Sequence, residues 1–171
     1  MSIKVLIVDD SALIREVLSR TLGRDGDIRV VGTAEDPIEA REKIKALNPD
    51  VVTLDIEMPN MNGLQFLDKL MRLRPLPVVM VSTLTTKGAS ETLLALELGA
   101  VDFVAKPNAS LAGGLEAFGE NLRQKVRAAS HSDVQGKSMK AATPRVVVHT
   151  AAGPAGSLIA IGASTGGVEA I

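Results

Sequence analysis

The chain has 171 residues, and its content of 46% hydrophobic and 23% charged residues is ordinary for a protein with a sizeable buried core. The net charge of -1 gives no general case for binding nucleic acid or an anionic membrane surface, and the absence of cysteine excludes disulfides and thiolate chemistry. No apolar stretch approaches the ~20 residues of a membrane helix, so we expect a soluble cytoplasmic protein without membrane insertion.

Five short apolar runs, rich in valine and isoleucine, follow one another at fairly even spacing and predict β-strands. They span residues 3–8, 28–33, 51–54, 78–81 and 101–105. Three of these runs are almost continuously apolar, which is the pattern of a parallel sheet covered on both faces.

Amphipathic helical patterns lie between and after these runs, and Asp36-Pro37 is a strong helix start. Each pattern predicts one apolar helix face, carried in turn by Leu13, Val17, Leu18 and Leu22; by Ile38, Ile44 and Leu47; by Leu64, Leu67, Leu70 and Met71; by Leu93, Leu94 and Leu98; and by Leu111, Leu115, Phe118, Leu122 and Val126. Strand and helix alternate five times, which predicts a doubly wound α/β domain over roughly residues 1–128.

The composition changes after Ala128, where serine, alanine, glycine, lysine and proline replace the periodic patterns. Such a segment is typical of a linker, and a new buried strand begins at Leu158. We therefore predict an interdomain linker at residues 126–156. Residues 157–171 are expected to be the first strand and turn of a second α/β domain that is truncated here.

Polar side chains stand where the predicted strands end: Asp9 and Asp10 after the first strand, Asp55 after the third, Ser82 after the fourth and Lys106 after the fifth. In a parallel sheet these ends share one edge. Carboxylates ~4 Å apart near a protein surface repel by roughly 4 kcal/mol, which Mg²⁺ relieves. An aspartate there can attack a phosphoryl group, with the lysine and hydroxyl neutralising its oxygens. A simpler interpretation of Asp9 and Asp10 alone is helix capping.

Four segments, VDDS (8–11), LDIEMPNMNG (54–63), VSTL (81–84) and DFVAKP (102–107), together resemble the receiver domain of bacterial two-component response regulators. The resemblance covers residues 1–125 and implies a flavodoxin-like five-stranded sheet in the order 2-1-3-4-5. It also implies that Asp55 is the phosphoacceptor and that a histidine kinase is the phosphodonor.

The same resemblance implies the remaining ligands of the site. Asp9, Asp10, Asp55 and the backbone carbonyl of Glu57 would hold Mg²⁺, with Asp9 acting mostly through water. We expect Gly63 to permit a turn with positive φ before the third helix.

Three further residues take roles by this resemblance. Ser82 would hydrogen-bond the phosphoryl group, where many relatives carry threonine, and Lys106 would pair with that group. Phe103 matches the aromatic switch position.

A second motif, IGASTGG at residues 161–167, places Ser164 among small residues after a strand. Such a turn suits a nucleophilic serine beside an oxyanion site, although a glycine-rich turn with a helix-capping hydroxyl fits the residues as well. After a receiver and a linker, the motif resembles the start of the catalytic domain of chemotaxis protein-glutamate methylesterases. This implies that Ser164 is the nucleophile. No histidine follows Ser164, so we expect its histidine and aspartate partners to be absent from this chain.

We therefore expect the first part of a receptor-modifying enzyme of bacterial chemotaxis. The resemblance implies hydrolysis of glutamate methyl esters, and deamidation of glutamines, on methylated chemoreceptors. It also implies that phosphorylation releases the receiver from its own catalytic domain. Two alternatives stay open: a phosphorylatable interaction module without hydrolase activity, and an aspartate-dependent phosphatase that uses Asp55 and Glu57. No nucleic acid partner is expected.

Overall fold

Five parallel strands form one sheet in the computed structural model, in the order β2-β1-β3-β4-β5. They are β1 (Ile3–Val8), β2 (Ile28–Ala34), β3 (Val51–Asp55), β4 (Val78–Ser82) and β5 (Asp102–Ala105). The structure describes residues 2–58, 61–83, 86–106, 114–132 and 134, which all lie in the first of two units of the chain, residues 1–139. The predicted strands and their order are confirmed.

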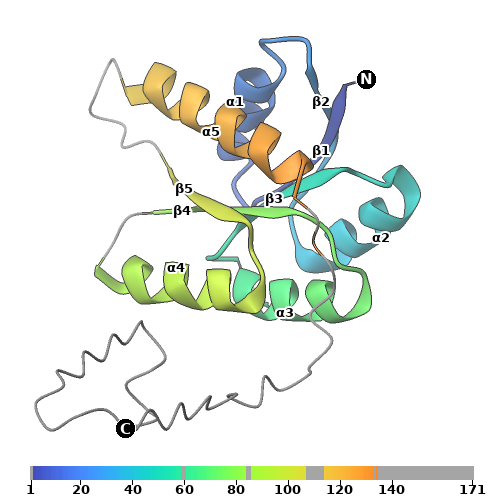
Figure 1. Cartoon of the computed structure of the whole chain (residues 1–171), viewed down its shortest axis with the longest axis vertical. Helices are drawn as coiled ribbons and strands as arrows, with labels where there is room; N and C mark the ends of the chain where they lie inside the picture. Colours follow the sequence, from blue (N-terminus) through green and yellow to red (C-terminus); the bar gives the residue numbers. More distant parts are fainter. Residues whose placement is uncertain (1, 59–60, 84–85, 107–113, 133, 135–171) are drawn as a thin grey trace, which may run out of the picture. The chain divides into compact units, whose positions relative to one another are not determined.

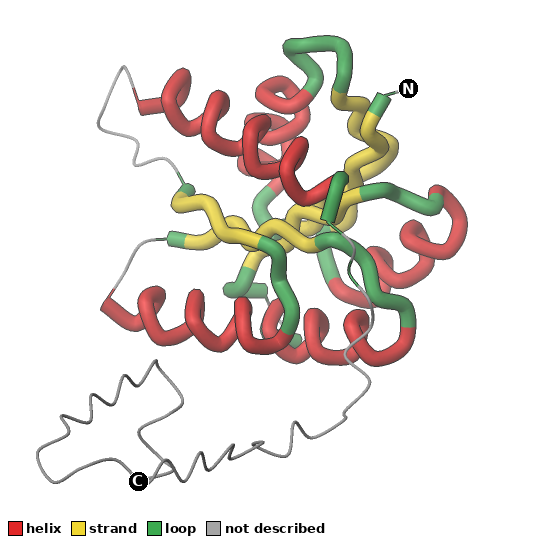
Figure 2. Tube along the Cα trace, in the orientation of Figure 1, coloured by secondary structure: helices red, strands yellow, loops and turns green. Residues whose placement is uncertain are grey.

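Helices cover both faces of the sheet (Figures 1 and 2). One face carries α1 (Ala12–Leu22) and α5 (Gly114–Ser130), and the other carries α2 (Pro37–Leu47), α3 (Gly63–Leu73) and α4 (Thr86–Leu98). The doubly wound α/β prediction is therefore confirmed. Residues 126–130, which we expected to open the linker, form the last part of α5.

The sheet supplies side chains to two cores. In β1, Leu6 and Val8 point to the layer of α2, α3 and α4, whereas Val5 and Ile7 point to the layer of α1 and α5. Because successive strand residues face opposite sides, a strand buried on both faces must be apolar throughout. This explains the continuous apolar runs of the sequence.

Helix α2 shows how the local sequence sets an element. Its N-cap, Asp36, accepts hydrogen bonds from the backbone N–H groups of Ile38 and Glu39, each at 2.8 Å, and Pro37 opens the first turn. The helix ends at Asn48, whose left-handed φ of 46° suits an asparagine C-cap.

Some of the predicted apolar faces were wrong at their margins. Leu13 and Ile38 are each 71% exposed, and Leu93, Leu94 and Leu115 are also exposed, so two of the three residues predicted for the apolar face of α4 lie toward solvent. At 3.6 residues per turn, Leu13 lies about 180° around its helix from Leu22, and Ile38 lies about 120° from Ile44. Apolar spacing had grouped residues that the helix geometry separates. Leu111 lies outside the described residues.

Candidate functional site

Three aspartates meet at the carboxyl edge of the sheet. Asp9 directly follows β1 and Asp55 is the last residue of β3; they are 0% and 2% exposed, whereas Asp10 is exposed. One carboxylate oxygen from each of the three lies within 4.8 Å of the other two. The parallel sheet thus brings together side chains that are 46 residues apart in the sequence, counting from Asp9 to Asp55.

Lys106 bridges the two buried aspartates from the end of β5. Its Nζ lies 2.9 Å from Asp9 Oδ2 and 2.8 Å from Asp55 Oδ2. The backbone N–H of Lys106 donates to the carbonyl of Ser82 at 2.8 Å, which ties the base of the lysine to the end of β4. The ammonium group is therefore held at the oxygens of the predicted phosphoacceptor.

Burial and ion pairing together shift the pKa values of Asp55 and Lys106 in this cluster. Burial raises the pKa of Asp55 from 3.8 to about 6; contact with Lys106 offsets only part of this effect, and the charge of Asp9 adds to it. Burial alone would lower the pKa of Lys106, but its ion pairs with Asp55 and Asp9 outweigh burial and raise it. Lys106 thus pairs with two of the three carboxylates, and Asp10 forms no ion pair within the described residues, so the site keeps an excess of negative charge.

This donor set fits a hard divalent cation. Mg²⁺ prefers oxygen ligands, usually takes one or two carboxylates and retains several waters. Two buried carboxylates with one exposed carboxylate, Asp10, supply such oxygens and leave one side toward solvent. The fit rests on donor chemistry and on the uncompensated charge.

The loop after Asp55 is packed against the start of α3. A Cβ at Gly63 would lie 1.9 Å from the backbone oxygen of Asp55, so only glycine allows this approach. The N–H of Gly63 donates to the carbonyl of Ile56 at 2.8 Å, and the Asn62 side chain accepts from the N–H of Leu64. Gly63 does not have a positive φ, so our expectation for it was wrong: close approach, not backbone handedness, requires the glycine.

Arg15 is a contributor that the sequence analysis missed. From α1, its Nη1 donates to the backbone carbonyls of Asp9 at 2.7 Å and of Asp10 at 3.0 Å. The N–H of Ser11 donates to Asp9 Oδ1 at 2.9 Å. These bonds hold the aspartate loop. A basic residue one turn into the helix was the only sequence signal, and it is indistinguishable from an ordinary exposed arginine.

Ser82 lies at the end of β4 and is buried. In the register of the sheet, Asp55 is opposite Val81, so Ser82 stands one residue beyond the aspartate on the next strand. Its hydroxyl donates to the carbonyl of Thr83 at 3.3 Å. The side chain is thus at the correct edge, with a hydroxyl bonded locally and weakly.

Phe103 lies within β5, opposite Met80, and is half-buried against the core beneath α3 and α4. Lys125 of α5 places its Nζ 5.2 Å from the centre of the Phe103 ring and 2.6 Å from Asp102 Oδ1. Phe103 therefore packs on the α3 and α4 side of the sheet, and the Lys125 ammonium reaches its ring from α5 past β5, the edge strand.

The remaining predicted features lie outside the described residues. These are Ser164 and most of the predicted linker. Glu57 is among the described residues and follows β3, and the role of its backbone carbonyl as a ligand stays a prediction. No helix in the described part of the chain combines the length and the apolar character that crossing a bilayer requires.

The sequence of this chain is similar to those of known proteins, both over the domain that carries the aspartates and over nearly its whole length. Residues 5–112 match the profile of the response regulator receiver domain. Over 99% of its length the chain is similar, at 59% identity, to the "Protein-glutamate methylesterase/protein-glutamine glutaminase 1" of Caulobacter vibrioides, of which it covers 48%. The chain therefore spans about half the length of the curated relatives it matches.

Two solved structures are also similar to this chain in fold and in sequence. The response regulator domain of Thermotoga maritima CheB is 46% identical with a TM-score of 0.70, over 78% of this chain and 99% of that one. A chain of the CheX-CheY-BeF₃-Mg²⁺ complex from Borrelia burgdorferi is 32% identical with a TM-score of 0.61, over 74% of this chain and 87% of that one.

Proposed function

The chain belongs to the response regulator receiver family, and from this premise we propose that Asp55 accepts a phosphoryl group in a chemotaxis signalling pathway. The observation that carries the proposal is the buried Asp55 carboxylate, which contacts Lys106 and lies beside Asp9 and Asp10. A buried carboxylate with a raised pKa among unbalanced charges marks a site that performs chemistry.

The proposed transfer step forms one bond and breaks one. An Asp55 carboxylate oxygen bonds to phosphorus while the P–N bond of a phosphohistidine donor breaks, and the bonding electron pair returns to the imidazole nitrogen. The donor is a histidine kinase. Lys106, already 2.8 Å from Asp55 Oδ2, stabilises the negative charge of the transferred group, and the Ser82 hydroxyl donates to one of its oxygens.

Mg²⁺ is the proposed cofactor, held by Asp9, Asp10, Asp55 and the backbone carbonyl of Glu57. An ion bound there would supply positive charge in addition to that of Lys106 and would neutralise phosphoryl oxygens. The Borrelia relative's complex contains both Mg²⁺ and BeF₃, an analogue of a phosphoryl group, which supports this assignment.

We assign Phe103 as the residue that transmits phosphorylation. Its half-buried ring lies on β5, beside the strand that ends in Ser82. Movement of the Ser82 hydroxyl toward a phosphoryl group would open space next to β5, and the ring would shift the balance between two arrangements of this face.

For the longer protein we propose a cytoplasmic methylesterase with Ser164 as nucleophile. It would hydrolyse glutamate methyl esters on chemoreceptors and deamidate glutamines. The unphosphorylated receiver would cover its own catalytic domain. The support is 59% identity to a relative that is named for both activities, across 48% of that relative's length.

One observation favours a narrower function for the 171 residues themselves. The chain covers 48% of that relative, and both of its histidines, His131 and His149, lie in the predicted linker before Ser164. By this second proposal the chain acts as a phosphorylatable interaction module, and mixing it with methylated receptor should release no methanol. Methanol release that is lost in a Ser164→Ala variant would contradict it.

The phosphoacceptor proposal is tested with a small phosphodonor that contains a P–N bond, phosphoramidate. We expect intact-mass spectrometry to show the addition of one phosphoryl group in the presence of Mg²⁺ and little addition in excess chelator. Peptide mapping should locate it at Asp55. Modification elsewhere, or modification indifferent to Mg²⁺, would refute the proposal, and rapid turnover of phosphate esters would indicate a phosphatase instead.

A further inference from the structure

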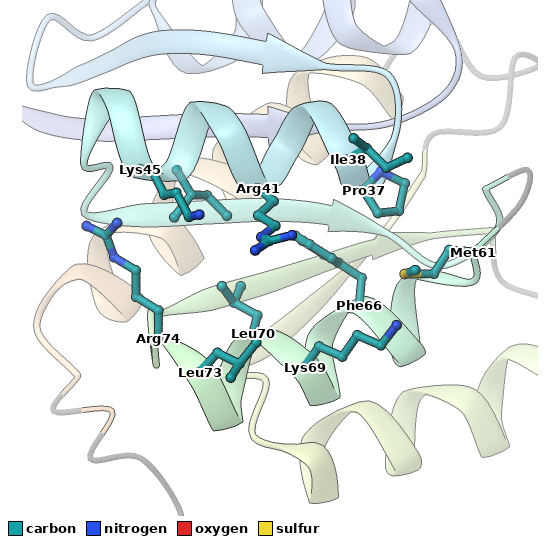
Figure 3. Close-up of a pocket in the computed structure, with 11 residues that line it drawn as sticks. Pro37, Ile38, Arg41, Lys45, Met61, Phe66, Lys69, Leu70, Leu73 and Arg74 are labelled. Atoms are coloured by element: carbon teal, nitrogen blue, oxygen red, sulfur yellow. The ribbon is translucent and has the colours of Figure 1, made fainter.

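A groove of about 550 Å³ runs between α2 and α3 (Figure 3); at one end its lining reaches Met61, in the loop after Asp55, but it includes none of the three aspartates. Its floor is apolar and buried, made by Ile44 of α2 and by Phe66 and Leu70 of α3. The groove follows both helices along their length, from Ile38 in the first turn of α2 to Leu73 at the end of α3. It therefore has the form of an elongated trough.

Two large apolar side chains at this groove face solvent. Ile38 is 71% exposed and Leu73 is 81% exposed, and Figure 3 shows them toward opposite ends of the groove. Single exposed apolar residues are common, but here two of them continue an apolar floor into one surface. Together they extend the apolar surface that a partner could bury.

The rim of the groove is basic. Arg41 and Lys45 project from α2, Lys69 projects from α3, and Arg74 follows α3 (Figure 3). Among the residues that the structure describes, no acidic side chain lines the groove, and Arg41, Lys45 and Lys69 take part in no ion pair. Arg74 donates to the side-chain oxygen of Asn48.

This concentration of cations is local, because the whole chain has a net charge of -1. Clustered cations around an apolar trough repel one another, and carboxylates from a partner would relieve this repulsion. The charge therefore selects an anionic occupant, and the trough selects an occupant with apolar side chains.

We propose that the α2–α3 groove is a docking site for a short acidic amphipathic helix of a partner protein. Apolar side chains at helical spacing enter between α2 and α3, and flanking carboxylates pair with Arg41, Lys45 and Lys69. This is the helix-in-groove mode of recognition, in which an apolar stripe gives affinity and charge gives specificity.

Other occupants fit less well. After residue 134 this sequence carries three basic residues, Lys137, Lys140 and Arg145, but only one acidic residue, Glu169, so that segment has the same sign of charge as the groove. A bilayer surface is suited to a convex apolar face and would not reach the floor of a trough.

The experiment uses a labelled peptide of 11 residues, the length of α2 and of α3, with leucines at positions i, i+3, i+4 and i+7 and glutamates elsewhere. Fluorescence anisotropy with the 171-residue protein should give a dissociation constant on the order of 10–100 μM that weakens as salt is raised. Control peptides replace every glutamate by lysine, or every leucine by serine, and neither should bind measurably.

Variants locate the binding. Lys69→Glu should weaken it at least tenfold, whereas Lys69→Arg should bind like the original protein, and Arg29→Glu, an exposed reversal outside the groove, should change little. Ile38→Ser should weaken binding, whereas Leu13→Ser, at a side chain of the same 71% exposure on α1, should not. Circular dichroism confirms that each variant is folded.

Several results would overturn the proposal. These are no binding at millimolar protein, equal binding of the lysine peptide, or affinity unchanged by Lys69→Glu and Ile38→Ser. Tighter binding to anionic vesicles would assign the surface to a membrane. If sedimentation shows a dimer that dissociates in the Ile38→Ser variant, the groove would instead bind a second copy of this chain. None of these outcomes depends on whether Asp55 is phosphorylated.

Discussion

Two clusters of carboxylates and cations lie at opposite edges of the same sheet. At the carboxyl edge, Lys106 pairs with Asp9 and Asp55, and Asp10 takes part in no ion pair with a described residue. At the amino edge, a second set of charges joins α5 to the loop before β2. That set, the amino-edge cluster, consists of Asp25, Asp27, Glu120, Arg123 and Arg127.

The amino-edge cluster is paired, and its carboxylates reach water although Arg123 is buried. Arg127 lies 2.7 Å from Asp25 and from Asp27, and Arg123 lies 2.9 Å from Asp25 and 2.7 Å from Glu120. Hydrogen bonding to Arg127 lowers the pKa of Asp27, and its acceptors raise the pKa of Arg127 in return. Such pairs stabilise the charged forms of both partners and connect elements far apart in the chain.

At the carboxyl edge the direction is reversed, because burial raises the pKa of Asp55 to about 6. The same residue types thus have opposite electrostatic effects at the two edges. Exposure and a close cation favour an ionised structural carboxylate, whereas burial with too few cations leaves a charge that a ligand can satisfy. The amino-edge cluster thus connects secondary-structure elements, whereas the carboxyl-edge cluster has the charge distribution of a ligand-binding site.

The largest expected effect is at the unbalanced edge. Asp55→Asn removes the nucleophilic oxygen but keeps the shape of the side chain, so phosphorylation by phosphoramidate should fall at least a hundredfold in an intact-mass assay. Asp68→Asn, which removes an exposed carboxylate paired with Arg72 on α3, is the matched control and should be phosphorylated normally. Undiminished phosphorylation of the Asp55→Asn variant would show that the carboxyl-edge cluster does not contain the phosphoacceptor.

Gly63→Ala tests the packing that holds Asp55. The added Cβ would lie 1.9 Å from the Asp55 backbone oxygen, and this contact cannot be relieved by rotating a side chain. We expect the free energy of unfolding to fall by at least about 3 kcal/mol in urea titrations. Gly26→Ala, with φ of +73° in open space, should cost only about 1 kcal/mol. Equal losses in the two variants would contradict this account.

A pH titration in chelator sharpens the electrostatic contrast. The folded-state pKa of Asp55 is raised from 3.8 to about 6, so between these values the folded protein binds more protons than the unfolded chain. Relative to Asp55→Asn, the original protein should therefore lose about 3 kcal/mol of stability as pH rises from about 3 to about 7, with most of the loss between about 4 and 6 and none above about 7. A relative gain over that range would show that the aspartate is stabilised by ionisation.

Arg123→Met probes the amino edge and should have the smallest effect. The Arg123 side chain is 5% exposed and methionine keeps most of its volume, but Asp25 and Glu120 lose a partner. Since those carboxylates still reach water, we expect a loss of about 1–2 kcal/mol in urea titrations with phosphorylation unchanged. Arg20→Met, which breaks an exposed pair with Glu16, should change stability by less than about 0.5 kcal/mol. A loss of phosphorylation in Arg123→Met would show that the two edges are coupled.

The fold was predictable because its signals are local. The continuous apolar runs predicted all five strands, and Asp36-Pro37 predicted the start of α2. The proximity of Asp9, Asp10 and Asp55 was predictable because the carboxyl ends of parallel strands lie at one edge of the sheet. The exposure of Leu13 and Ile38 was missed because residues that lie about 120–180° apart around their helices were grouped on one face.

The rest depends on approach between distant groups. Arg15 binds the Asp9 and Asp10 carbonyls, and Gly63 lies against Asp55, yet neither contact leaves a pattern in the sequence. The same holds for the α2–α3 groove, because it requires side chains of two separate helices to face one another.

By itself the sequence determined the periodicity of each element, the order of polar residues at the strand ends and, through its motifs, the resemblance to receiver domains. Tertiary structure decided which charges are buried together, and so why Asp55 is hard to ionise while Asp27 ionises readily. The physical reason is that spacing along the chain sets hydrogen bonding and facing within one element. Burial and distances of a few ångströms between elements arise only when the sheet and both helical layers are packed.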